Sequence, residues 1–518
     1  MQGRDDGQRQ LLDVETWAGH LLPAGSVFEF LAQHRHELFP DEAFSDLFPS
    51  NLGRRSIPAE VIASVLVLQT LHNLSDRETA DAVTFDLRWK AACGFGMTES
   101  SFHPSALTYW RRRLAGSERP HRIFDAVAEV IAQSGALAGR RRRAVDSTIL
   151  DDAVARQDTV TQLIAQIRRV AREIPATAEL IAGLPGHDYS QPGKPEIAWD
   201  DATARDALVS ALVSDALTVL EHTQPLELTD RQREALALLA LVAGQDVEPA
   251  EGSDGTDGRW RIARKVAPDR VISTVDPETR HAHKSREKRQ DGYKAHVVIE
   301  PDTGLVTAAA LTGASGPANS DAARGAELLE ADASIGDEPV EVLADSAYGS
   351  GALLERVQRA GHVAVIKPMP LRRAVPDGFT IDDFTVDHAA GTATCPAGTT
   401  RPISPKGKVT FGAACAGCPL RQRCTTAARG RKMTLTEHDR IKREHRARAK
   451  EPAFQAVYRQ HRPMVERSIA WMTRGARRVP YRGVASNHAW WVTRAAAINL
   501  QRLLKLGLNQ RDRAWALA

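Results

Sequence analysis

Val340-Glu341-Val342-Leu343-Ala344-Asp345-Ser346-Ala347-Tyr348-Gly349 is the stretch that best indicates how this chain folds. A short apolar run leads into an aspartate, and small residues with a glycine then turn the chain. The pattern predicts a buried strand that carries Asp345 at its carboxyl end. Ligands of open α/β sheets bind outside such strand ends. Asp345 is therefore the first candidate for a functional residue.

A second stretch, Ala144-Val145-Asp146-Ser147-Thr148-Ile149-Leu150, has the same form, and a third carboxylate, Glu466, lies in a helical segment predicted over 452–474. Three carboxylates offer the hard oxygen ligands that select Mg²⁺ or Mn²⁺. Two such ions, roughly 3.5–4 Å apart, activate a water or a 3′-hydroxyl in phosphoryl transfer. The simpler alternative is that Arg462 and Glu466, four residues apart, form only an exposed ion pair.

The composition sets few limits on the function. The chain has 518 residues, enough for about two to four domains, and a net charge of only +3 from 68 Lys and Arg against 65 Asp and Glu. No apolar run reaches the roughly 18 residues of a membrane span, and the first residues contain no apolar signal core. We therefore expect a cytoplasmic protein that makes no contact with a membrane.

The order of predicted elements indicates an α/β fold, with a mixed sheet flanked by helices, an all-helical region before it and a helical insertion within it. We expect the following divisions: a flexible lead-in 1–25, a helical DNA-binding domain 26–135, a sheet core 136–150 and 263–368, a helical insertion 151–262, a cysteine-rich and basic insertion 369–451, and C-terminal helices 452–518 that complete the core.

The helical domain contains a Ser-x-x-Glu capping box at Ser75–Glu78 and a last helix, 105–114, that ends in Arg111, Arg112 and Arg113. Short helices with a basic final helix are typical of a helix-turn-helix-like DNA-binding unit. A helical bundle with a solvated basic end fits the same pattern.

The cysteines cluster late in the chain, as Cys395-x19-Cys415-x2-Cys418-x5-Cys424, whereas Cys93 stands alone. Four thiolates suit one tetrahedral, structural zinc ion in a loop-rich segment, with no open position for chemistry. The alternative is four unligated cysteines.

Basic runs lie near the candidate acids. Four arginines, 140–143, precede Asp146, and residues 459–482 carry seven arginines against Glu466 alone. Such runs fit a polyanion that approaches the acids. A solvated edge of the protein is the simpler interpretation.

Several of these stretches together resemble the DDE transposases of bacterial insertion sequences, in the branch with a cysteine cluster. The similarity is carried by the following motifs: Leu74-Ser75-Asp76-Arg77-Glu78, Tyr109-Trp110-Arg111-Arg112-Arg113-Leu114, Ala144-Val145-Asp146-Ser147-Thr148, Asp291-Gly292-Tyr293-Lys294-Ala295-His296, Leu343-Ala344-Asp345-Ser346-Ala347-Tyr348-Gly349, and Tyr458 with Arg462-x3-Glu466. The signature's tyrosine stands one residue further from the arginine than is usual, and its lysine position falls at Thr473, next to Arg474.

The resemblance implies an RNase H-like catalytic core in which Asp146, Asp345 and Glu466 are catalytic and bind two Mg²⁺ or Mn²⁺ ions. It implies that water cuts the transposon end and that the freed 3′-hydroxyl attacks target DNA. Arg462 and Arg474 would contact phosphate, and Tyr348 and Tyr458 a base or sugar, although either tyrosine fits packing equally. The partners would be double-stranded inverted-repeat ends and target DNA, bound by a homodimer or higher oligomer associated with the bacterial nucleoid.

Three other functions compete with this interpretation. A metal-dependent nuclease without strand transfer would use the same residues. A domesticated DNA-binding regulator would keep the basic helices and lose an acid, whereas all three acids are present. A zinc-centred adaptor would leave the two aspartates unexplained.

Overall fold

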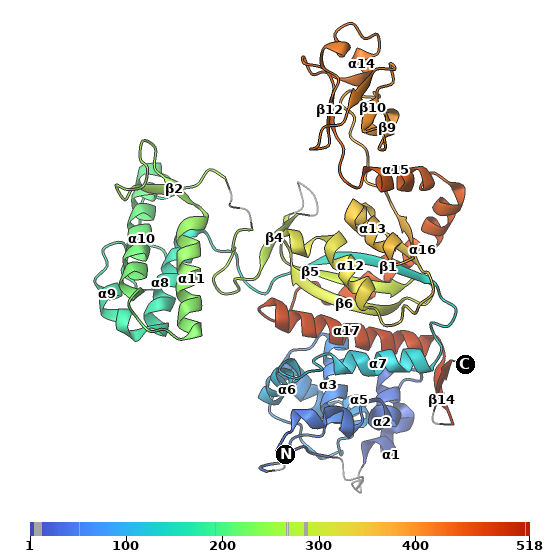
Figure 1. The fold of residues 1–518 in the computed structure, drawn as a ribbon. Coiled ribbons are helices and arrows are strands. Elements are labelled where there is room, and N and C mark those ends of the chain that lie inside the picture. Colours follow the sequence, from blue (N-terminus) through green and yellow to red (C-terminus); the bar gives the residue numbers. More distant parts are fainter. Residues whose placement is uncertain are drawn as a thin grey trace.

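The structure is a computed structural model that describes residues 1–4, 13–50, 52–191, 193–265, 267, 269–283, 289–512 and 514–517 (Figure 1). Residues 5–12 of the predicted flexible lead-in lie outside the described residues. Within its described part, helix α1 (Val14–Ala18) and the 3-10 turn η1 (Gly19–Leu21) form. No helix in the described ranges is long and apolar enough to cross a membrane.

A six-stranded mixed sheet is the centre of the molecule. Its strands are β1 (Arg142–Asp151), β4 (Arg280–His283), β5 (Arg289–Glu300), β6 (Leu305–Gly313), β7 (Glu341–Ala344) and β8 (Val363–Ile366). β5 pairs antiparallel with β1 on one side and with β4 and β6 on the other, whereas β1, β7 and β8 are parallel neighbours. The predicted α/β class with a mixed sheet and flanking helices is confirmed.

Helices cover both faces of this sheet, because successive strand residues point to opposite sides. Val145 packs with α12 (Asp321–Ala331) and α13 (Gly351–Arg359), on one face. Ala144 packs with α16 (Pro452–Thr473) and α17 (Val484–Lys505), on the other. Figure 1 shows α12 and α13 above the strands and α17 below them.

Helix α17 is buried on two sides and joins the N-terminal helices to the sheet (Figure 1). Its Trp491 and Ile498 pack on the strands, whereas Ala497 and Leu500 belong to the core of the N-terminal helices. These helices are α2 (Val27–Leu38), α3 (Ala59–His72), α4 (Asp76–Phe85), α5 (Leu87–Cys93), α6 (Ser105–Ala115) and α7 (Arg122–Gln133). The capping box predicted at Ser75 and Glu78 is present at the start of α4. A terminal hairpin, β14 (Leu508–Arg511) and β15 (Ala514–Leu517), follows α17.

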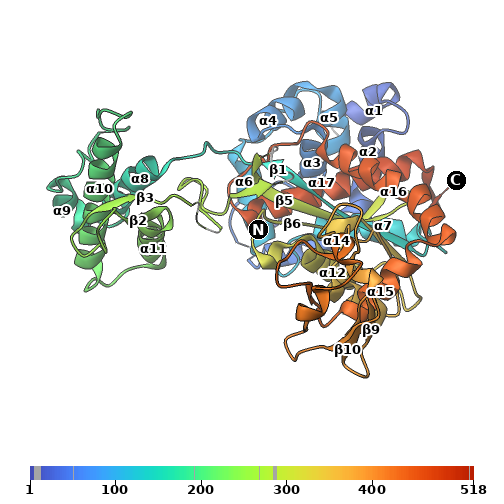
Figure 2. The same ribbon diagram turned by 90° about the horizontal axis from the view of Figure 1, so that it is seen from above.

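The segment between β1 and β4 forms a separate helical cluster that projects away from the sheet (Figures 1 and 2). Its elements are α8 (Thr159–Glu173), α9 (Ala178–Ala182), α10 (Ala202–Thr223), α11 (Asp230–Gln245), β2 (Val247–Pro249) and β3 (Trp260–Ile262). Leucines and valines of α8, α10 and α11 form its own apolar core. The cluster therefore buries its apolar surface without the sheet.

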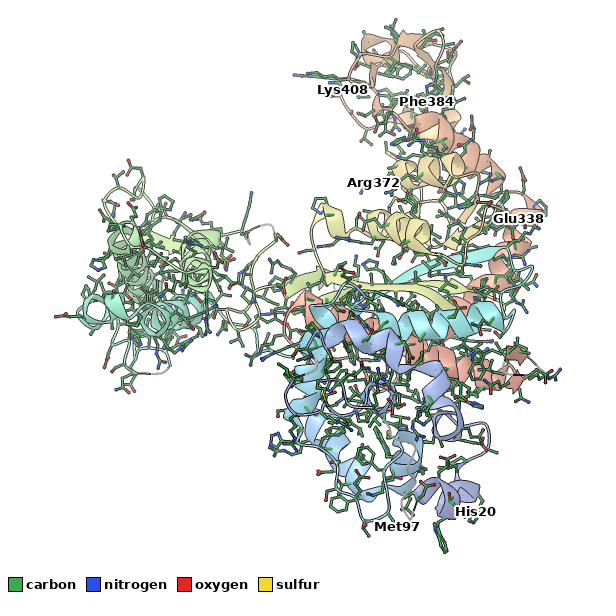
Figure 3. All side chains as sticks on the ribbon, turned by 60° about the horizontal axis from the view of Figure 1, so that its bottom comes forward. His20, Met97, Glu338, Arg372, Phe384 and Lys408 are labelled. Atoms are coloured by element: carbon green, nitrogen blue, oxygen red, sulfur yellow. The ribbon has the colours of Figure 1, made fainter. Side chains whose placement is uncertain are left out.

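The cysteine-rich segment forms a second projection, at the top of Figure 1. Its short elements are β9 (Thr385–Asp387), β10 (Thr392–Thr394), β11 (Thr400–Pro402), β12 (Lys408–Thr410), α14 (Arg421–Cys424) and β13 (Lys432–Thr434). Phe384, which is labelled in Figure 3, packs with Phe411 in a small core of its own. Helix α15 (Asp439–Arg448) then leads the chain back to the sheet.

Candidate functional site

Asp146 and Asp345 lie on neighbouring parallel strands, where the ladder between these strands ends. The pairing of β1 with β7 stops at Ala144 and Leu343, and Asp345 directly follows the last residue of β7. The prediction that Asp146 ends its strand is wrong: β1 continues to Asp151 because β5 still pairs with it. Each aspartate is two residues beyond a side chain that packs towards α16, so both carboxylates face that helix.

Helix α16 presents Tyr458, Arg462 and Glu466 at intervals of four residues, so that they share one face. The Arg462 guanidinium donates to Asp146 Oδ2 at 2.6 Å and to the Val145 carbonyl at 3.4 Å. Glu466, one turn further along the helix, is exposed. Pro463 lies between them without ending the helix. The predicted proximity of Arg462 to the acids is therefore present in the structure, in contact with Asp146.

Burial dominates the electrostatics of Asp146, whose relative exposure is 8%. Burial raises the pKa of this carboxyl to about 6, the Arg462 charge acts in the opposite direction, and the Asp345 charge raises it further. Burial also raises the pKa of Tyr458. The Arg462 charge lowers it, and the charges of Asp345, Asp146 and Glu466 raise it further. All three predicted acids thus act on one tyrosine, and they belong to one electrostatic neighbourhood.

The donor set fits a hard divalent cation. Carboxylate oxygens are the ligands that Mg²⁺ and Mn²⁺ prefer, and a cation beside Asp146 would offset the cost of its buried charge. In the arrangement of the described residues, however, no group of three or more His, Cys, Asp or Glu side chains is set to hold a metal ion. The Arg462 guanidinium instead pairs with the Asp146 carboxylate, which a bound cation would also use as a ligand.

Sequence reasoning missed the residues that fix the part of β1 around Asp146. Ser147 donates to Asp146 Oδ1 through its backbone N–H and to Asp321 through its hydroxyl, at 2.8 and 2.5 Å. Lys294, one strand away, donates to the same Asp321 carboxylate at 3.3 Å. Asp321 begins α12 next to an N-cap serine, a context in which an aspartate is unremarkable for any helix. Its sequence position therefore carried no signal.

Tyr348, one of the two tyrosines predicted to contact DNA, is fully enclosed. Its exposure is 0%, and it packs among the apolar residues under α12 and α13. A Cβ atom at Gly325 of α12 would come within 2.7 Å of its ring, so the glycine makes room for it. Tyr348 therefore packs the core in this structure and cannot reach DNA, whereas Tyr458 is only half-buried beside the acids.

Two of the three arginines predicted to bind DNA at the end of α6 have partners within the protein. Arg111 pairs with Asp76 at 2.5 Å and lies over the Tyr481 ring. Arg113 donates to the Leu47 carbonyl and lies over the rings of Phe48 and Tyr109. Arg112 alone is exposed. In this arrangement only Arg112 is free to meet a phosphate.

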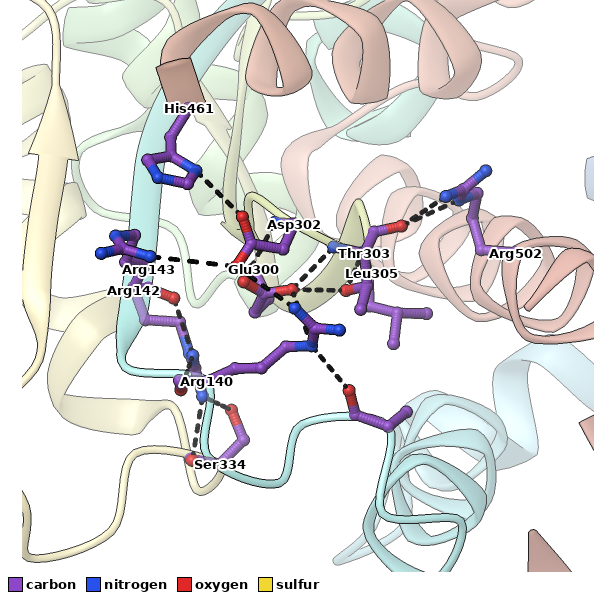
Figure 4. Close-up of polar contacts among 11 residues, drawn as sticks. Arg140, Arg142, Arg143, Glu300, Asp302, Thr303, Leu305, Ser334, His461 and Arg502 are labelled. Carbon is purple, nitrogen blue, oxygen red and sulfur yellow. Dashed lines mark hydrogen bonds and ion pairs between the residues drawn. The ribbon is translucent and has the colours of Figure 1, made fainter. Parts of the chain in front are cut away.

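The arginines at 140–143 do not surround the acids, contrary to the polyanion hypothesis. They lie at the opposite end of β1 from Asp151, and each pairs with an acid there. Figure 4 shows Arg140 and Arg142 beside Asp302. Arg143 is buried against Asp332 at 3.1 Å, and Arg140 and Arg142 contact Asp302 at 3.2 and 3.9 Å. These arginines hold the start of β1, and their charges are compensated within the fold.

The four clustered cysteines line one cavity of about 20 Å³ in the cysteine-rich projection. Burial raises the pKa of the Cys424 thiol, Arg431 acts in the opposite direction, and Cys415, Cys395 and Cys418 raise it further. The described cysteines are all free, without disulfides. The sequence cluster is thus a cluster in space, although its thiols, in the described residues, are not set in a metal-binding geometry.

Two family models match the chain. One, described as Transposase DDE domain, matches residues 394–504, which include the four cysteines and Glu466. The other, described as Transposase domain (DUF772), matches residues 19–113, which end at Arg113. No curated protein and no solved structure matches the chain. The two matched segments pack together across α17. Together the two matches support a DDE transposase of an insertion sequence, and the DDE domain indicates an enzyme of the metal-dependent polynucleotidyl transferase and endonuclease class.

Proposed function

We propose that this transposase cuts DNA at the ends of its element and joins the freed 3′-hydroxyl to target DNA, with Asp146, Asp345 and Glu466 as the ligands of two divalent ions in an RNase H-like core. The observation that supports this most is the contact of Arg462 with Asp146, because it brings the α16 face that carries Glu466 against the sheet edge that carries both aspartates. The strand order supports the core: β5 pairs antiparallel with β1, β4 and β6, and β1, β7 and β8 are parallel neighbours.

The residues have separate roles in this proposal. Bound Mg²⁺ or Mn²⁺ ions supply a nucleophile at neutral pH and stabilise the leaving oxygen. Asp146 and Asp345 would hold one cation, and Glu466 would supply oxygen ligands from the face of α16 that it shares with Arg462. Arg462 moves its guanidinium from Asp146 to the phosphate that is cut, where a bidentate donor suits the phosphate oxygens. Tyr458 supports the sugar or base next to that phosphate, and Arg474 contacts the backbone further along.

The proposal is tested with DNA that carries the inverted repeats flanking the gene, incubated with Mg²⁺ or Mn²⁺ and a target plasmid. The parental protein should release cut ends and then joined products. Asp345→Asn should lose both products while circular dichroism and DNA binding stay unchanged, because one oxygen ligand is removed. Asp377→Asn, an exposed aspartate in the loop after β8, is the matched control.

The outcomes separate the competing functions. Cut ends without joined products would make the protein a nuclease without strand transfer. Binding without cutting by the parental protein would make it a regulator. Full Mg²⁺-dependent cleavage by Asp345→Asn would contradict the three-acid assignment itself.

We also propose that Cys395, Cys415, Cys418 and Cys424 bind one structural zinc ion. Their shared cavity of about 20 Å³ supports this, because it has room for one small occupant. Metal analysis of the purified protein should find about one zinc per chain. Cys418→Ser should lower the zinc content and the melting temperature, whereas Cys93→Ala, in the N-terminal core, should leave the zinc content unchanged. Metal-free protein of unaltered stability would refute the site.

The proposed partners are double-stranded transposon ends and target DNA, bound by a homodimer or a higher oligomer. The N-terminal helices would recognise the ends, with Arg112 as the exposed basic side chain of α6. Binding of labelled end DNA against a random duplex of equal length measures this preference. Equal affinity for the two duplexes would move end recognition to another part of the chain.

A further inference from the structure

The loop between α16 and α17, residues 474–483, presents an uncompensated positive charge. It contains four arginines, all of them exposed: Arg474, Arg477, Arg478 and Arg482. The loop holds no acidic residue. Among the described residues, no ion pair or hydrogen bond engages any of these four guanidinium groups. Only Arg474 was expected to contact DNA, and the other three were unassigned.

The backbone of this loop is held to the end of β1. The Asp151 N–H donates to the Arg477 carbonyl at 2.8 Å, and the Val479 N–H donates to the Asp151 carbonyl at 2.9 Å. Ala476 and Val479 are buried with the core of the sheet, between exposed arginines. The arginines therefore project from a fixed main chain, and little backbone entropy is lost when they meet a ligand.

Two side chains from neighbouring helices bond to the start of the loop. Arg494 of α17, with 1% exposure, donates to the carbonyls of Thr70 in α3, Met472 in α16 and Arg474 in the loop. The Asn73 amide, at the end of α3, donates to the Gly475 carbonyl at 2.5 Å. The N-terminal helices are thus bonded directly to the start of the arginine loop.

Arg111 supports the other half of the loop. Its guanidinium lies 5.0 Å from the centre of the Tyr481 ring and is fixed there by Asp76. The backbone of Tyr481 exchanges hydrogen bonds with the Asn487 side chain at 3.1 and 2.9 Å. Arg111, expected to bind DNA, instead positions Tyr481 beside Arg482.

We propose that the loop 474–483 is a preformed clamp for the backbone of duplex DNA beside the cut phosphate, and that Arg111 is a positioning residue of this clamp. Four free guanidinium groups on a fixed loop suit successive phosphates, which arginine binds in a bidentate manner. Asp151, which anchors the loop, is five residues along β1 from Asp146, about 17 Å away at roughly 3.3 Å per residue. That distance corresponds to about five base pairs at 3.4 Å each. The inference rests on the proposed function, since it takes Asp146 as the place of cutting.

The test measures binding of the full chain to a 30-base-pair duplex of arbitrary sequence, without divalent ions, at several salt concentrations. Each phosphate contact contributes about 0.9 to the slope of log affinity against log salt. Arg477→Ala with Arg478→Ala should lower that slope by about 2 and weaken binding by about 10-fold per arginine at 0.1 M salt. Arg477→Lys with Arg478→Lys should retain most of the slope. Arg205→Ala with Arg401→Ala, two exposed arginines of the two projections, is the charge-matched control and should change little.

Arg111 gives an independent readout. Arg111→Ala should lower the melting temperature and weaken binding while leaving the salt slope unchanged, because no phosphate contact is removed; Arg111→Lys should restore part of the binding. A slope lower by about 1 in Arg111→Ala would make Arg111 a DNA contact. An unchanged slope in the alanine pair would overturn the duplex clamp. Because no cleavage is measured, either result leaves the three-acid proposal standing.

Discussion

The segment 140–143 and the loop 474–483 each carry four arginines, yet the fold uses the two sets in opposite ways. At 140–143 every arginine meets an acid, and Arg143 is 1% exposed against Asp332. In the loop, none of the four guanidinium groups pairs with an acid among the described residues, and all are exposed. One set is near the start of β1 and the other is bonded to its end at Asp151.

The difference lies in the neighbours that the fold supplies. Arg142 pairs with Glu341 at the start of β7, 199 residues later in the chain. Arg143 pairs with Asp332 after α12, 189 residues later. The loop instead receives donors from neighbouring helices: its backbone carbonyls accept from the Asn73 amide and the Arg494 guanidinium, and the Arg111 guanidinium lies over the ring of its tyrosine. Removing a charge that is paired within the protein should therefore lower stability. Removing an unpaired charge should instead lower activity or DNA binding.

The largest expected effect follows from an exposed charge. Glu466 lies one turn beyond Arg462, and no ion pair engages it among the described residues. Glu466→Gln should reduce strand cleavage by about 100-fold or more, equivalent to about 3 kcal/mol of transition-state stabilisation, because a metal ligand is lost. The melting temperature should stay the same. Glu451→Gln, at the N-cap of the same helix, is the control, and cleavage at the parental rate by Glu466→Gln would remove Glu466 from the site.

A compensated charge should show the reverse pattern. Arg143→Ala leaves Asp332 buried without its guanidinium partner, which should cost about 3–5 kcal/mol of unfolding free energy. Arg143→Met with Asp332→Leu should recover most of that loss, since it removes both charges and keeps the volume. Urea denaturation of the three proteins measures this. A small loss in Arg143→Ala would mean that Thr307 and Ser334, which also donate to Asp332, suffice for its charge.

Sequence patterns located much of the site because its signals are local. Asp345 follows β7 as expected, and α16 covers the predicted helix up to Thr473. These features depend on apolar runs, turn residues and helical spacing within a few residues. A family resemblance then linked three acids that are far apart along the chain.

The remaining features depend on partners that no local pattern contains. Asp146 was expected at a strand end, and β1 instead continues for five residues because β5, more than a hundred residues later, pairs with it. The role of Arg111 depends in the same way on Tyr481, and that of Ser147 on Asp321. Whether a basic run is free or compensated is likewise decided by tertiary contacts.

The pKa of Asp146 gives an effect of intermediate size. Because burial raises this pKa to about 6, the carboxyl is protonated below that pH and ionised above it. Only the ionised form is a metal ligand. The affinity for Mn²⁺ should therefore be constant above about pH 6 and fall about tenfold per pH unit below it. Calorimetric titration at pH 5.5 should also detect the release of about three-quarters of a proton when the ion binds to this carboxyl. An affinity that stays constant down to pH 4 would contradict the role of this carboxyl.

The smallest expected effect concerns Arg141, the arginine of the segment 140–143 that is both paired and exposed. Arg141 belongs to the compensated set, but it pairs with Glu338 while its side chain is 58% exposed and that of Glu338 is 68% exposed. Solvent and salt screen such a pair, so Arg141→Ala should change the unfolding free energy by less than about 1 kcal/mol. If ion pairing within the protein, and not exposure, decides whether an arginine binds DNA, the salt slope of duplex binding by Arg141→Ala should also stay within error of the parental value. A slope lower by about 0.9 would show that Arg141 leaves Glu338 for a phosphate. Exposure alone would then distinguish the arginines that bind DNA from those that hold the fold, and the loop 474–483 would share its role with the start of β1.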